Sequence, residues 1–277
     1  MTRLLRYRHD GFTFDVTDQG PLDGDPVVLL HGWPERASSW RKVSPLLHAH
    51  GLRTYAPDQR GYSQGARPKR RRDYALQHLV GDVVALIETI GRPVHLVGHD
   101  WGGAIGWLVA AQRPDLVRTW TSASTPHTKA FAHALMTTRQ GLKSWYMGAF
   151  QLPGVAEAMA RSGRMDVPLR KGGMTADDVR RVHEEVIDDD AMHYALMYYR
   201  AIPFSYPALK DSVVRVPTTF VWSDKDVAIT EAALHTTPQY VEAPYEAVTL
   251  EGVSHWIPTE APEALAEHIL KRIDSVS

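Results

Sequence analysis

The sequence of 277 residues predicts an α/β protein with a mostly parallel, doubly wound sheet and an inserted helical segment. Three observations carry this prediction. Short β-rich runs alternate with helical patterns. The run 93–98 is almost entirely apolar, as expected of a central strand buried on both faces. The strand pattern stops between 127 and 211, so we expect a helical insertion there, after the sixth core strand, between core parts 1–126 and 212–277.

Each element follows from its own local pattern. Strands are expected at 12–17, 26–31, 52–57, 93–98, 218–222 and 247–250. Apolar residues recur at helical spacing over 74–90, which stops at Gly91, and further helices are expected at 101–112 and 262–274. Every methionine except the initiator lies in the insertion. Methionine suits both an ordinary helical core and a mobile lid over an apolar pocket.

Composition excludes several classes of function. The formal net charge is −1, so nothing indicates a nucleic-acid partner or an anionic membrane, and the basic run 69–72 is expected to be a solvated loop. Cysteine is absent, which excludes disulfides and thiolate nucleophiles. The histidines form no ligand-spaced cluster, so no metal is predicted. The N-terminus lacks an apolar signal region and no apolar run could span a bilayer, so a soluble cytoplasmic protein is expected.

Residues 98–103, Gly-His-Asp-Trp-Gly-Gly, stand between a predicted buried strand and a predicted helix. This is the G-x-nucleophile-x-G pattern of a strand–turn–helix elbow, with Asp100 where serine is usual. A β-turn with a capping aspartate is the structural alternative. Carboxylate attack on an ester carbonyl would give an anhydride, whereas attack on a strained or activated sp³ carbon gives an alkyl ester that water can split. An epoxide or alkyl halide substrate is therefore predicted.

An elbow of this kind needs an acid and then a histidine further along the chain. Asp226 follows the strand 218–222, and His255 follows the strand 247–250. We choose Asp226 over Asp224 as the acid that orients His255, and His255 as the base that activates water. The backbone N–H groups of Trp33 and Trp101 are expected to form the oxyanion hole.

Together these segments resemble the epoxide hydrolase branch of the α/β-hydrolase fold family, over nearly the whole chain. The motifs are His31-Gly-Trp-Pro-Glu35, Asp58-Gln-Arg-Gly-Tyr-Ser63, Gly98-His-Asp-Trp-Gly-Gly103, Phe150-Gln-Leu-Pro-Gly154, Tyr198-Tyr-Arg200, Trp222-Ser-Asp-Lys-Asp226 and Gly252-Val-Ser-His-Trp-Ile-Pro258. The resemblance implies a helical cap, no cofactor, a cis Trp33–Pro34 bond and two cap tyrosines that bind the epoxide oxygen.

Tyr199 matches one of these tyrosines. At the position of the other the chain carries Ala149, and Tyr146, one helical turn earlier, is the nearest candidate. The expected substrate is a small apolar epoxide that reacts with water, in a pocket lined by Trp33, Trp101, Met147, Phe150, Tyr198 and Trp256. Two alternatives remain open: a haloalkane dehalogenase with the same nucleophile, in which Trp101 would hold halide, and a non-catalytic ligand receptor on this fold.

Overall fold

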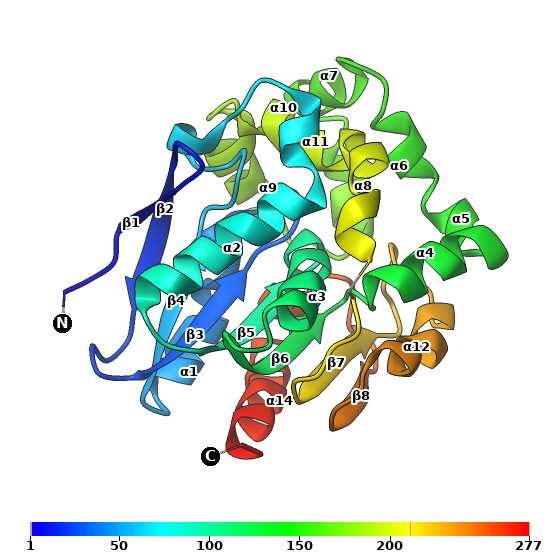
Figure 1. The fold of residues 1–277 in the computed structure, drawn as a ribbon. Coiled ribbons are helices and arrows are strands. Elements are labelled where there is room, and N and C mark those ends of the chain that lie inside the picture. Colours follow the sequence, from blue (N-terminus) through cyan, green and yellow to red (C-terminus); the bar gives the residue numbers. More distant parts are fainter. Residues whose placement is uncertain (1, 211, 277) are drawn as a thin grey trace.

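The computed structural model describes residues 2–210 and 212–276 (Figure 1). Within them, eight strands form one sheet in the order β1-β2-β4-β3-β5-β6-β7-β8. The pairs β1–β2 and β2–β4 are antiparallel, and every other pair is parallel. The strands are β1 (Arg6–His9), β2 (Phe12–Gln19), β3 (Asp25–Leu30), β4 (Leu52–Pro57), β5 (Val94–His99), β6 (Val117–Ala123), β7 (Thr218–Ser223) and β8 (Tyr245–Leu250). All six strands named from the sequence are present, in addition to β1 and β6.

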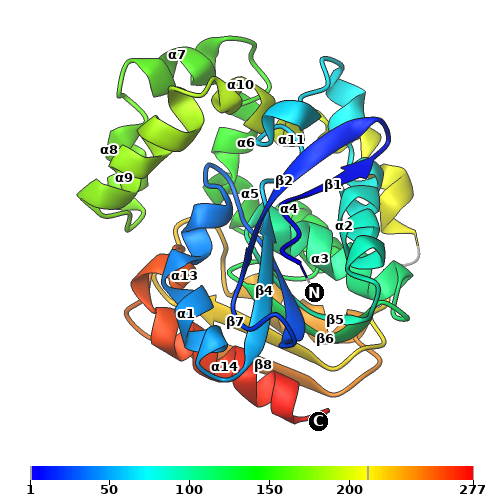
Figure 2. The same ribbon diagram turned by 90° about the vertical axis from the view of Figure 1, so that its left-hand side faces the viewer.

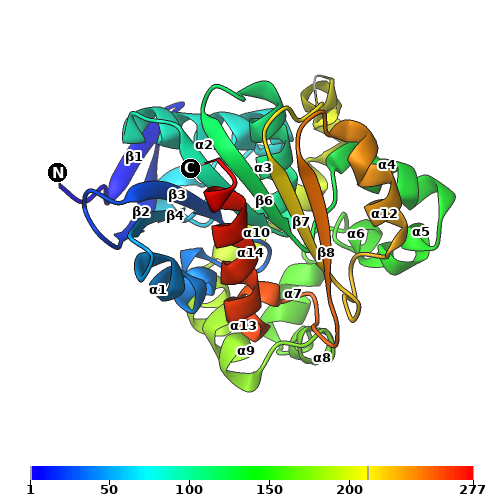
Figure 3. The same ribbon diagram turned by 90° about the horizontal axis from the view of Figure 1, so that it is seen from below.

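Helices cover both faces of this sheet, as Figure 3 shows from below. The core helices are α1 (Val43–His48), α2 (Leu76–Ile90), α3 (Trp101–Gln112), α12 (Ala232–Thr236), α13 (Ile257–Glu260) and α14 (Pro262–Asp274). Consecutive residues of β3 face opposite layers because side chains alternate along a strand. Val27 and Leu29 pack in a core with residues of α1 and α14, whereas Val28 and Leu30 pack in a second core with residues of α2 and α3. The predicted doubly wound α/β sheet is therefore confirmed.

Between 127 and 210 the described residues form helices and no strand. We call this stretch the helical segment; its expected end at 211 lies outside the described residues. Its helices lie together at one end of the sheet (Figure 2). They are α4 (Thr128–Thr137), α5 (Gln140–Lys143), α6 (Trp145–Ala149), α7 (Val155–Arg161), α8 (Asp166–Lys171), α9 (Ala176–Val182), the π-helix η4 (His183–Ile187), α10 (Ala191–Ala195), α11 (Met197–Arg200), and the 3-10 helices η5 (Ile202–Phe204) and η6 (Tyr206–Leu209).

Short 3-10 helices complete the core: η1 (Ala37–Arg41), η2 (Gln64–Ala66), η3 (Arg71–Tyr74) and η7 (Thr237–Tyr240). Among the residues that the structure describes, no helix is both long enough and apolar enough to cross a membrane.

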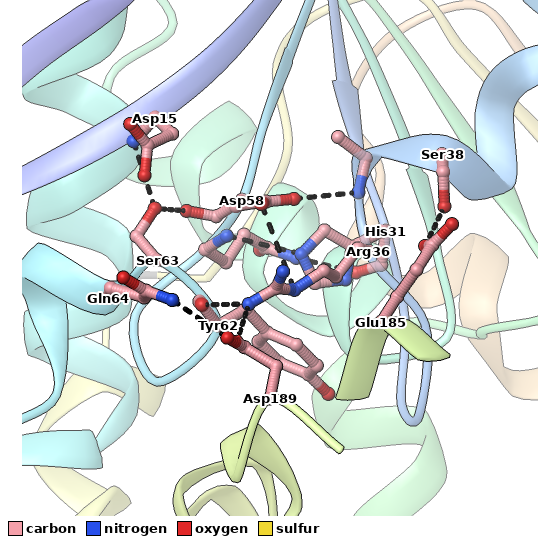
Figure 4. A network of polar contacts seen from close by, with 12 residues as sticks. Asp15, His31, Arg36, Ser38, Asp58, Tyr62, Ser63, Gln64, Glu185 and Asp189 are labelled. Atoms are coloured by element: carbon pink, nitrogen blue, oxygen red, sulfur yellow. Dashed lines mark hydrogen bonds and ion pairs between the residues drawn. The ribbon is translucent and has the colours of Figure 1, made fainter. Parts of the chain in front are cut away.

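Ion pairs fasten the helical segment to the core at Asp189, just after η4 (Figure 4). The Asp189 carboxylate accepts hydrogen bonds from Arg36 at 2.5 Å, from Gln64 at 2.8 Å and from Arg67. Arg36 also donates to the carbonyl oxygen of Tyr62, and Ser38 donates to Glu185. Arg36 lies three residues after Trp33, so the same loop reaches both Asp189 and the neighbourhood of Asp100.

Replacing Asp189 by Asn should therefore loosen this contact, at a cost of about 1–2 kcal/mol in the free energy of unfolding. Although burial raises the pKa of Asp189, hydrogen bonds from Gln64 and Arg67 lower it overall. The stabilising charge is thus present at neutral pH and is lost as the pH falls through the lowered pKa, so wild type and variant should converge in acid. Urea unfolding at several pH values measures this. The exposed neighbour Asp188, changed to Asn, is the control, and an equal loss there would contradict the assignment.

Candidate active site

Asp100 lies on a tight turn between β5 and α3, as the sequence predicts. Its backbone has φ 51° and ψ −120°, an unusual left-handed conformation for a residue with a side chain. Glycines permit the turn: a Cβ on Gly98 would lie 2.4 Å from the carbonyl oxygen of Gly102, and one on Gly32 would lie 2.4 Å from the Cβ of Asp100. Because α3 begins at Trp101, its positive end adjoins the Asp100 carboxylate.

The structure brings Asp100, Asp226 and His255 together. His255 Nδ1 donates to Asp226 Oδ2 at 2.8 Å, and His255 Nε2 lies 3.6 Å from Asp100 Oδ2. The other Asp226 oxygen accepts from the backbone N–H groups of Ala228 and Ile229 at 2.7 and 2.8 Å. This loop therefore locks the buried Asp226 carboxylate toward His255.

Asp224, the alternative acid, points elsewhere. It accepts from the backbone N–H of Gly252 at 2.7 Å and pairs with Lys225 at 3.0 Å, both at the surface. His255 binds Asp226 and not Asp224, so the geometry favours Asp226.

The surrounding charges keep the nucleophile candidate ionised. Burial raises the pKa of Asp100, but the hydrogen bond and positive charge of His255 outweigh burial and lower it overall. Burial likewise lowers the pKa of His255, but the charge of Asp226 and hydrogen bonds to Asp100 and Asp226 raise it to about 10. At neutral pH the free site therefore holds an imidazolium between two carboxylates.

The loop after β3 meets Asp100 from the other side. The backbone N–H of Trp33 donates to Asp100 Oδ1 at 2.8 Å, and the Trp33–Pro34 peptide bond is cis, as the family resemblance predicts. The Thr125 hydroxyl donates to the Asp100 carbonyl oxygen at 2.9 Å. One of the two expected oxyanion donors thus already points at the carboxylate.

Tyr199 and Tyr146 reach the same cavity from the helical segment, and their rings lie 6.2 Å apart. The ring of Trp101 packs edge-to-face against the ring of Tyr199 at 5.1 Å. Burial and the Asp100 charge raise the pKa of Tyr199 well above its usual range, and burial also raises that of Tyr146. Both hydroxyls therefore stay protonated and can donate.

A cavity of about 450 Å³ opens beside Asp100. Trp101 and Met147 line it, as expected, together with residues of α3, α4, α6, η5 and η6. Four residues that we expected in the lining do not line it. Trp33 and Phe150 pack against the ring of Tyr199 at 5.7 and 5.0 Å, one layer away.

The other two residues that we expected in the lining, Tyr198 and Trp256, are buried elsewhere. Neighbouring residues of a helix point about 100° apart, so Tyr198 points away from the cavity that Tyr199 lines. The Tyr198 hydroxyl donates to the Arg60 carbonyl oxygen at 2.8 Å. Trp256 packs on the rings of His255 and His99.

Two buried groups near the triad were not singled out from the sequence, although both lie inside quoted motifs. His99 Nε2 donates to the His255 carbonyl oxygen at 2.9 Å, and burial, with the nearby His255 charge, lowers the pKa of His99 to about 4. Glu35 lies 4.0 Å from His99 Nδ1, and burial raises its pKa to about 8. Within the described residues, no group of three or more His, Asp or Glu side chains could hold a metal ion.

The sequence of this chain is similar to those of known proteins. A family model described as alpha/beta hydrolase fold matches residues 25–262. The AB hydrolase superfamily protein YfhM of Bacillus subtilis is 32% identical over 276 residues, 95% of this chain and 94% of that protein. Epoxide hydrolase 3 of Xenopus tropicalis is 31% identical over 274 residues, 94% of this chain and 74% of that protein.

Solved structures agree with the sequence relatives. An epoxide hydrolase from Vigna radiata has a TM-score of 0.83 and 28% identity, covering 98% of this chain and 97% of its own. Potato epoxide hydrolase I has a TM-score of 0.82 and 25% identity, with 98% of each chain covered. The chain therefore belongs to the α/β-hydrolase fold family, in the branch that includes the epoxide hydrolases.

Proposed function

We propose that this protein hydrolyses apolar epoxides to vicinal diols through a covalent ester on Asp100, and that the helical segment is the cap of the active site. One observation carries the proposal: an ionised Asp100 faces both the His255–Asp226 pair and a cavity that holds the Tyr199 and Tyr146 side chains. The relatives named as epoxide hydrolases support the same class of reaction.

In the first step, an Asp100 carboxylate oxygen attacks a ring carbon of the epoxide, and the bond between that carbon and the ring oxygen breaks. The ring oxygen takes a proton from Tyr199, while Tyr146 donates a hydrogen bond to it. The His255 imidazolium makes up the proton lost by Tyr199. An alkyl ester on Asp100, a neutral Tyr199 and a neutral His255 remain.

Formation of the ester prepares the second step. It removes the Asp100 charge, one of the interactions that raise the pKa of His255, so the imidazole becomes available as a base. His255 takes a proton from water, and the water oxygen attacks the ester carbonyl carbon while the N–H groups of Trp33 and Trp101 bind the oxyanion. The diol leaves with one proton of this water. The other stays on His255, and Asp100 is again a carboxylate.

Two other functions use the same fold. A haloalkane dehalogenase would need the Trp101 indole N–H for the halide ion, and it would have no need of the Tyr199 and Tyr146 hydroxyls in the cavity. A ligand receptor would have no need of a buried carboxylate–imidazolium–carboxylate arrangement. Both therefore explain fewer of the observed contacts than epoxide hydrolysis does.

A turnover screen with one styrene-type epoxide and one bromoalkane tests the proposal. We expect diol from the epoxide and no bromide ion from the bromoalkane. Bromide release without diol formation would identify a dehalogenase. Saturable binding of both compounds without turnover of either would favour the receptor.

Replacing Tyr199 by Phe should slow formation of the ester by about 10²-fold, because it removes a donor to the developing alkoxide and keeps the ring. Tyr146→Phe should do the same to a smaller degree. Rapid mixing with excess enzyme, followed by the fluorescence of the nearby Trp33 and Trp101, measures this step. Tyr198→Phe is the control, since its hydroxyl binds the Arg60 carbonyl oxygen. A defect confined to Tyr198→Phe would show that the wrong tyrosine has been assigned.

A further inference from the structure

One wall of the cavity beside Asp100 follows a single helix. Thr125, whose hydroxyl binds the Asp100 carbonyl oxygen, lines the cavity, and α4 begins three residues later. Four lining residues of α4 are spaced as i, i+3, i+4 and i+7, so they share one face of the helix: Thr128, Phe131, Ala132 and Leu135. Since an α-helix rises 1.5 Å per residue, this face extends the cavity by about 10 Å.

Another part of the wall comes from η5 and η6 and reaches the surface. Ile202, Pro203, Tyr206 and Leu209 line the cavity there. Ile202 and Tyr206 are 38% and 75% exposed, whereas Trp101 and Tyr199 at the other end are half-buried and buried. A molecule that reaches Asp100 along this cavity therefore leaves its far end between α4 and η6, near solvent.

The cavity wall favours an uncharged chain. Asp100 is the only charged side chain among the described residues that line it. The hydroxyls of Thr125 and Ser205 donate to the backbone carbonyl oxygens of Asp100 and Ala201, whereas the buried hydroxyl of Thr128 has no hydrogen-bond partner among the residues that the structure describes. Most of the other lining side chains are aliphatic or aromatic, so burial of an apolar chain is favourable, and each buried methylene strengthens binding by about four-fold.

The loops around Asp100 contribute unequally to the cavity lining. Neither the loop that carries Trp33 nor the loop that carries His255 contributes a lining residue. The Trp33 ring packs against Phe150 at 5.0 Å, and the Trp256 ring packs against His255 at 5.1 Å, so aromatic side chains fill these regions. A second large substituent on the epoxide would have to displace them.

We propose that the preferred substrate is a terminal epoxide with one long, uncharged apolar chain that lies along α4, and that Ala132 and Leu135 set the chain length it can carry. This inference rests on the proposed epoxide hydrolysis. It adds the substrate class and two residues that determine specificity.

The first test compares kcat/KM for the terminal epoxides of butane, octane and dodecane on the unchanged protein. We expect the octane epoxide to exceed the butane epoxide at least ten-fold. The internal trans epoxide of 4-octene has the same formula but two shorter substituents, and it should react at least ten-fold more slowly than terminal octane epoxide. Equal values across the chain lengths, or equal values for the two octane isomers, would overturn the inference and leave epoxide hydrolysis intact.

The second test fills the cavity along α4. In Leu135→Trp and in Ala132→Trp, the ratio of kcat/KM for octane epoxide to that for butane epoxide should fall at least ten-fold. Met136→Trp is the matched control: Met136 is on the same helix, 80% exposed and outside the lining, and the ratio should stay within two-fold of wild type.

A third variant enlarges the cavity instead of filling it, so the inference can still be tested if the tryptophan variants misfold. Leu135→Ala lengthens the cavity and should raise the ratio of dodecane to octane epoxide at least three-fold. An unchanged ratio in both Leu135 variants, with circular dichroism like that of wild type, would refute the placement of the chain along α4. If the unchanged protein hydrolyses no epoxide of the series, the proposed function itself fails.

Discussion

Incubating a His255→Gln variant with a terminal epoxide should leave the ester on Asp100 intact, with turnover reduced by about 10²–10⁴-fold. Attack by Asp100 needs no base, and solvent can supply the proton that His255 otherwise returns to Tyr199. Hydrolysis of the ester, in contrast, needs a proton acceptor at Nε2, which lies 3.6 Å from Asp100. Glutamine cannot take that proton. Intact-protein mass spectrometry should therefore show the protein plus the whole substrate mass, because epoxide opening expels no leaving group.

The adduct should map to the peptide that contains Asp100 and disappear when Asp100→Ala is added to His255→Gln. A bromoalkane gives a different mass, the substrate less hydrogen bromide. If bromoalkanes alone label Asp100, the protein is a dehalogenase. If neither class labels a folded variant, the covalent mechanism is wrong.

Strands could be predicted from the sequence where the buried side chains are apolar, and not elsewhere. β5 is buried along its whole length and carries the apolar residues Val94, Leu96 and Val97, so its pattern is clear. β6 is buried except at Arg118 but carries threonine and serine, and Thr119 binds the Nδ1 of His95 at 2.8 Å, so its buried side chains give a weaker apolar signal. β1 is a charged edge strand with only Tyr7 buried. Pairing with neighbours, rather than composition, makes these two segments strands.

The triad candidates could be located for a similar physical reason. Their positions at strand ends follow from the order of elements, and parallel strands bring those ends to one edge of the sheet. The cavity depends instead on how the helical segment packs on the core. Which of Tyr198 and Tyr199 faces Asp100 is decided by the rotation of the short helix α11, and its four residues give too little periodicity to fix that rotation.

The same dependence on packing explains why some residues that we expected to line the cavity do not line it. Phe150 and Trp33 come from different parts of the chain, and each covers Tyr199 only because the helical segment folds back over the loop after β3. The ion pairs at Asp189 that hold the segment there also join residues far apart in sequence. Spacing along the chain carries no information about such contacts.

Asp226→Asn should lower kcat by about 10³–10⁴-fold, the second large effect that we expect. One oxygen of Asp226 accepts from two backbone N–H groups, so the asparagine oxygen has to occupy that position and its NH₂ group then faces His255 Nδ1. Nδ1 must accept that hydrogen bond, which leaves the proton on Nε2. An imidazole in this tautomer cannot take a proton from water at Nε2.

Two readouts distinguish this defect from a loss of folding. Formation of the ester, measured in a single turnover, should be affected much less than its hydrolysis, so the ester should accumulate as in His255→Gln. The pKa of His255, followed by NMR, should fall from about 10, since the Asp226 charge is one of the interactions that raise it.

Asp224→Asn is the matched control for Asp226→Asn, two residues away on the same loop. Its carboxylate binds Gly252 and Lys225 at the surface, so kcat should stay within about two-fold of wild type. The opposite result, in which Asp224→Asn is inactive and Asp226→Asn is active, would mean that the acid has been misassigned. If neither change lowers kcat while His255→Gln still accumulates the ester, His255 acts without a carboxylate partner, and the buried Asp226 serves only to order the loop between β7 and α12.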